Sequence, residues 1–113
     1  MKIVKNNITL DELQQMSQKM FGGFVKAVVD IEQEIMAVDA ELHADLEALL
    51  LQDGSKQRSL WGVNLYPQLY GDEFVEFDSM INMRPSEGNT SRGVDDEKVR
   101  NRILMIIGKR IIR

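Results

Sequence analysis

Five polar side chains around Pro85 have the types and spacing to bind an anion or a protein partner. They are Asn82, Arg84, Asn89, Ser91 and Arg92. Two arginines that flank a glycine-containing turn can hold a carboxylate or a phosphate through paired, planar hydrogen bonds. We therefore expect a binding edge over residues 76–92, with an unknown protein or a small anionic ligand as its partner. The competing interpretation is that both arginines neutralise nearby acids and fix the loop.

A second set of side chains could bind a divalent metal. It consists of Asp39, Glu41, His43 and Asp45, with Glu47 following. On a strand these side chains would share one face and offer oxygen and imidazole ligands, whereas on a helix they split into pairs four residues apart. The alternative function is thus a metal-assisted hydrolase or nuclease, with His43 and Asp45 as catalytic residues. The plainer interpretation is a solvated helix, so the preferred prediction has no catalytic residue, no metal and no cofactor.

A third set surrounds the single tryptophan. Trp61 and Gly62 are followed by Asn64, Tyr66 and Tyr70. A lone tryptophan in a strand is typical of a core, and the glycine beside it indicates a bulge or a close approach by another segment. An aromatic platform for nucleobases would require Lys or Arg between the aromatic residues. The segment from residue 60 to 70 contains neither, which argues against such a platform. The absence of cysteine, the single histidine and the lack of a G-x-S-x-G elbow exclude a nucleophilic triad.

One long strand from residue 73 to 84 would position the first set. Strand side chains alternate between two faces. The alternation predicts one buried face, made of Val75, Phe77, Ser79, Ile81 and Met83. It predicts an opposite, wetter face, made of Phe74, Glu76, Asp78, Met80, Asn82 and Arg84. Pro85 ends this strand because proline lacks a backbone donor.

The other elements follow from capping residues and periodicity. Thr9 and Glu12 form a capping box for a helix that ends at Gly22-Gly23. Residues 24–31 and 34–38 are predicted to be hairpin strands, and residues 60–66 a further strand. Residues 39–53 alternate like a strand but carry leucines at helical spacing, and we predict a helix capped by Asp39. A final helix begins near Asp95. The order β-α-β-β-α-β-β-α predicts one α+β domain over residues 1–113. Its antiparallel sheet has about five strands, with three helices on one face.

The composition of the 113-residue chain limits the possible partners. A formal net charge of −4 argues against a protein that binds a phosphate backbone, and we expect no nucleic-acid partner. No apolar run approaches a membrane span or a signal peptide, and we expect a cytoplasmic protein without a membrane partner. Residues 30–53 carry eight acids and no Lys or Arg, while residues 98–113 carry six basic residues and no acid. These segments face each other within one chain or lie on solvated faces. The alternative is that they pair between copies of the chain, head to tail or in a homodimer.

Nearly the whole chain resembles a family of small prokaryotic proteins of uncharacterised function. The likeness rests on residues 20–55, on LWGVNLYP at residues 60–67 and on EFDSMINMRPSEGNTSRGV at residues 76–94. The resemblance implies a stand-alone domain and carries no activity with it. From the polar edge over residues 76–92 we expect a non-enzymatic binding or protein-interaction module, and the metal-assisted hydrolase or nuclease is the alternative.

Overall fold

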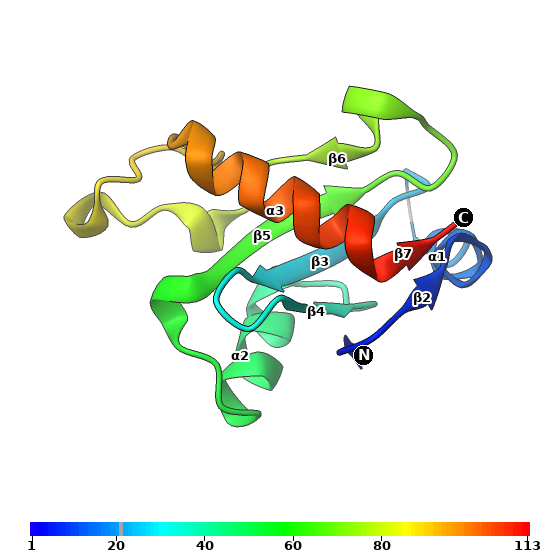
Figure 1. Ribbon diagram of the computed structural model, residues 1–113, viewed down its shortest axis with the longest axis horizontal. Helices are drawn as coiled ribbons and strands as arrows, with labels where there is room; N and C mark the ends of the chain where they lie inside the picture. Colours follow the sequence, from blue (N-terminus) through cyan, green and yellow to red (C-terminus); the bar gives the residue numbers. More distant parts are fainter. Residues whose placement is uncertain (21) are drawn as a thin grey trace.

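The computed structural model describes residues 1–20 and 22–113; Phe21, at the end of the expected first helix, lies outside them. A five-stranded antiparallel sheet has the order β1-β4-β3-β5-β6 (Figure 1). Its strands are β1 (Lys2–Val4), β3 (Val25–Asp30), β4 (Ile35–Val38), β5 (Leu60–Leu65) and β6 (Val75–Glu76). The short strands β2 (Ile8–Thr9) and β7 (Ile111–Ile112) form a separate parallel pair. With three helices, this confirms the predicted α+β class.

The helices are α1 (Leu10–Ser17), α2 (His43–Gln52) and α3 (Glu97–Arg110). Short 3-10 turns are η1 (Gln57–Ser59), η2 (Gly71–Glu73), η3 (Met80–Asn82) and η4 (Pro85–Glu87). The cap predicted for α1 is confirmed, because the Thr9 hydroxyl accepts the Glu12 N–H at 3.1 Å. The cap predicted for α2 is wrong: Asp39 has a φ of 74°, and the helix begins four residues later, after Leu42. Within the described residues, no helix has the length and apolarity needed to cross a bilayer.

Helices cover both faces of the sheet, which corrects the predicted one-sided packing. Alternate residues of β3 belong to two separate cores: Val29 packs with α1 and α3, whereas Val28 packs with Leu46 and Leu50 of α2. Figure 1 shows α3 crossing in front of β3 and β5. Because both faces are buried, β3 and β4 are nearly continuous apolar runs.

The predicted long strand over residues 73–84 is wrong, since β6 contains only Val75 and Glu76. Glu76 is paired with Asn64, so a longer β6 would next have brought residue 78 opposite Gly62. Instead the chain turns away, and side chains take the place of the strand. The Asn82 side chain accepts the Gly62 N–H at 2.8 Å and donates to the Gly62 carbonyl at 3.0 Å. Farther along the same edge, Arg84 donates to the carbonyl of Leu60 at 2.7 Å.

Gly62 permits this close approach, which confirms one of the two interpretations of its position. A Cβ placed on Gly62 would lie 2.6 Å from both Cβ and Oγ of Ser79. That separation is far below van der Waals contact, so any larger residue would push the segment of Ser79 and Asn82 off β5. The Asn82 amide can therefore bind the β5 backbone only because Gly62 has no side chain.

Asn89 closes the loop that follows. Its Nδ2 donates to the carbonyls of Asn82, Ser91 and Gly93, and its Oδ1 accepts the Asp95 N–H at 2.8 Å. Two backbone hydrogen bonds join Arg84 and Asn89 across the turn. One buried amide thus fixes residues 82–95 without a regular strand or helix.

The acidic and basic segments meet within the chain. Glu34, in the turn between β3 and β4, lies 2.9 Å from Lys109 and 3.6 Å from Arg102 of α3. Arg110 also donates to the Glu34 carbonyl at 2.8 Å. Glu34 therefore joins the two segments within one chain, and pairing of these segments in a homodimer stays a prediction.

Replacing Asn82 by Ala should destabilise the fold by about 3 kcal/mol, because it leaves buried backbone groups of Gly62 without hydrogen-bond partners. Urea denaturation measures this change, with the exposed Asn7→Ala as the matched control. If the free energy of unfolding of Asn82→Ala lies within about 0.5 kcal/mol of the wild-type value, the Asn82 side chain does not hold the edge of β5 as described.

We expect Gly62→Ala to lower the free energy of unfolding by about 2 kcal/mol through the clash with Ser79.

Candidate functional site

A concave site lies on the α2 face of the sheet, and we name it the polar hollow. Its volume is about 470 Å³. It is lined by Phe24, Lys26, Leu42, His43, Ala44, Asn64, Tyr66, Glu76, Asp78, Ser79, Met80, Ile81 and Arg92. These residues come from β3, the start of α2, β5, β6 and the segment after β6. Residues 78–81, which follow β6, thus form one wall of the hollow.

His43, the first residue of α2, points into the sheet and is 8% exposed. Its Nε2 lies 2.8 Å from the Val63 carbonyl oxygen. A carbonyl can only accept, so Nε2 carries the proton and Nδ1 keeps a lone pair. Burial lowers the pKa of His43, and the hydrogen bond to Val63 opposes that shift only in part. The imidazole is consequently neutral at pH 7.

A hydrogen-bond network holds one carboxylate at the far side of the hollow. Asn64 donates from Nδ2 to Glu76 Oε1 at 2.8 Å, and the Tyr66 hydroxyl donates to the same oxygen at 3.1 Å. Partial burial and the Glu76 carboxylate raise the pKa of Tyr66, so its hydroxyl stays protonated. Asn64 is 7% exposed, and its buried Oδ1 has no hydrogen-bond partner in the described part of the chain.

The two remaining charged groups of that side pair with each other. Arg92 donates from Nε to Asp78 Oδ1 at 2.7 Å, with both side chains about half exposed. Such an exposed pair contributes at most about 1 kcal/mol to stability. Its effect here is to neutralise two of the charges in the polar hollow.

The structure separates the five residues of the predicted binding edge. Asn82 and Asn89 are 0% and 4% exposed and hold backbone groups, which corrects the predicted outward orientation of Asn82. Ser91 donates to Asp95 at the start of α3. Arg92 alone among the five lines the polar hollow.

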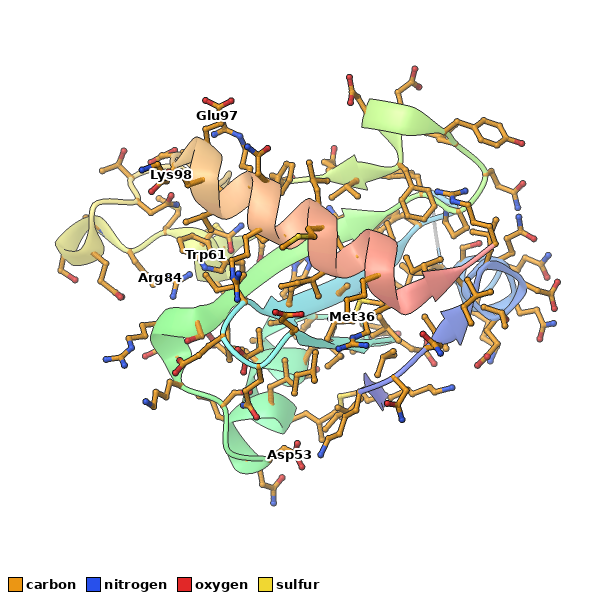
Figure 2. The ribbon with its side chains drawn as sticks, viewed as in Figure 1. Met36, Asp53, Trp61, Arg84, Glu97 and Lys98 are labelled. Carbon is orange, nitrogen blue, oxygen red and sulfur yellow. The ribbon has the colours of Figure 1, made fainter. Side chains whose placement is uncertain are left out.

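Arg84 lines a different hollow, also of about 470 Å³, together with Trp61, Arg58 and Glu87. Its guanidinium carbon lies 4.0 Å from the centre of the Trp61 ring, and Figure 2 shows the two side chains close together. Arg84 also donates to the carbonyls of Gln57 and Leu60. The two predicted anion-binding arginines therefore do not converge on one ligand.

The acidic and histidine set is also dispersed. Glu41 and Asp45 are exposed, Asp39 is half-buried before α2, and His43 points inward. In the part of the chain that the structure describes, no three His, Asp or Glu side chains lie close enough to hold a metal ion. His43 contributes to the polar hollow without the acids that precede it in the sequence.

Sequence reasoning missed Lys26 and Glu76 as residues of one site. The signal that joins them is strand register: Lys26 is paired with Asn64, and Asn64 is paired with Glu76. Their spacing along the chain does not reveal this arrangement, because it requires the order β3-β5-β6 to be known.

The buried imidazole predicts a pH dependence of folding. The pKa of His43 is lower in the folded than in the unfolded chain, where it is about 6.5. As the pH falls through that value, the unfolded state gains a proton that the folded state refuses. Stability is therefore full above about pH 7 and declines below it, by at most about 1.4 kcal/mol per pH unit.

Urea denaturation between pH 7.5 and 5.5 measures the decline, and it should be weaker in His43→Gln, whose amide can still donate to Val63. His43 is the only histidine, so no other side chain is expected to titrate mainly in this range. Equal pH slopes in the two proteins, or an imidazole pKa of 6.5 or above by NMR, would contradict this account.

We compared the sequence with family models, curated proteins and solved structures. No curated protein and no solved structure gives a significant match. A family model described as "Protein of unknown function (DUF5674)" matches residues 2–110. The chain therefore belongs to the DUF5674 family.

Proposed function

We propose that this protein is a non-enzymatic binding domain that takes a small polar molecule in the polar hollow. The observation that carries the proposal is Asn64, which is buried at the hollow and orients the Glu76 carboxylate through a hydrogen bond of 2.8 Å from its Nδ2. This carboxylate can accept a hydrogen bond from a ligand N–H or O–H.

The polar groups of the hollow are held in place before any ligand arrives. Glu76 is fixed through Oε1 by Asn64 and Tyr66, and Asp78 is fixed through Oδ1 by Arg92. The second oxygen of each carboxylate has no hydrogen bond within the described residues. Preorganised groups lose little entropy on binding, and the volume is within the usual range for small-molecule pockets.

Binding is favoured over catalysis because the hollow offers no open serine beside His43. Ser79, the serine that lines it, is 1% exposed, and its oxygen accepts the Ile81 N–H. Of the predicted contact edge, the proposal retains Arg92. It does not use Arg84, whose guanidinium is already bound to two carbonyls.

Saturation-transfer NMR with three mixtures tests this proposal: L-amino acids, ribonucleosides and neutral sugars. We expect at least one compound to receive saturation from the wild-type protein, with at least tenfold weaker affinity for Asn64→Leu. Arg58→Ala, in the hollow of Arg84, is the matched control and should bind as wild type does. No binding to any mixture, or equal binding by Asn64→Leu, would overturn the proposal.

A further inference from the structure

We infer that the polar hollow selects a zwitterion, an α-amino acid with an apolar side chain. This inference rests on the proposed function and deepens it. It concerns the charges that remain available once the internal pairs of the hollow are taken into account.

Three neighbouring strands present a cation, an amide and a carboxylate in one row. Lys26 on β3 is paired with Asn64 on β5, which is paired with Glu76 on β6. Side chains at paired positions lie on the same face, and adjacent strands are about 4.8 Å apart. Asn64 thus stands between Lys26 and Glu76, and the two charges form no ion pair with each other.

Lys26 provides the positive end of the row. In the described part of the chain no carboxylate lies within 4.0 Å of its ammonium group, although six other lysines and arginines have such a partner. The start of α2 lies beside it, and this ten-residue helix has Leu42 at its cap position with no side-chain hydrogen bond. Uncapped amides and the helix dipole favour a negative group there.

Glu76 provides the negative end. Its Oε1 accepts hydrogen bonds from Asn64 and Tyr66, whereas its Oε2 has no donor among the described residues and suits an ammonium group. Arg92 and Asp78 neutralise each other. Among the described residues that line the hollow, Lys26 is therefore the cation and Glu76 the anion without an ion-pair partner, and Asn64 lies between them.

An α-amino acid carries the two charges that this row can bind, a carboxylate for the Lys26 ammonium and an ammonium for the Glu76 carboxylate. Phe24, Leu42, Met80 and Ile81 supply apolar surface for the ligand side chain.

Isothermal titration with L-leucine, L-leucinamide and N-acetyl-L-leucine tests the two charge contacts separately. We expect the wild-type protein to bind leucine at least tenfold more tightly than either blocked form. Lys26→Met should bind leucine and leucinamide equally, because the carboxylate contact is lost. Glu76→Gln should bind leucine and N-acetyl-L-leucine equally, because the ammonium contact is lost. Lys5→Met and Glu12→Gln, at exposed ion pairs elsewhere, should leave the wild-type preferences unchanged.

The outcomes distinguish this inference from the proposed function. Wild-type protein that binds a blocked form as tightly as leucine, or binds only nucleosides or sugars, overturns the zwitterion inference while the hollow remains a binding site. Failure to bind any of the three mixtures overturns both. Unchanged preferences in Lys26→Met and Glu76→Gln also overturn the inference.

Discussion

The outer edge of β5 must have its backbone groups satisfied, and the rest of the site depends on how this is done. β6 pairs with only two residues of β5. Beyond them, the Asn82 amide and the Arg84 guanidinium supply the hydrogen bonds that a longer strand would have made. Because side chains do this, the main chain can leave the sheet, and residues 78–81 of the departing segment line the polar hollow.

This edge of β5 imposes two requirements on the sequence. Gly62 must be small, since Ser79 lies where its Cβ would be. The segment after β6 must carry an amide that can both donate and accept, which Asn82 does at the backbone of one residue. Asn89 also binds backbone groups through its side-chain amide, donating to three carbonyls and accepting one N–H within the loop. The segment between residues 77 and 96, which has no α-helix or named strand, is thus held by two buried amides.

The sequence predicted the parts of the fold that depend on local signals. The Thr9 cap, the hairpin of β3 and β4, and the close approach at Gly62 follow from residue type and periodicity. The long strand failed because alternation alone cannot show that Asn82 and Arg84 bind another strand's backbone. The site was recovered only in part: His43 and Arg92 were identified, but their union with Lys26, Asn64 and Glu76 depends on sheet order and register.

Native-state hydrogen exchange of the Gly62 amide tests the central claim most directly. If the Asn82 side chain replaces a strand, the Gly62 N–H is bonded on the outer edge of β5. Its exchange should then be as slow as that of the β5 amides that face β3. Exchange of Gly62 at the rate of the exposed turn at residues 86–88 would contradict the account.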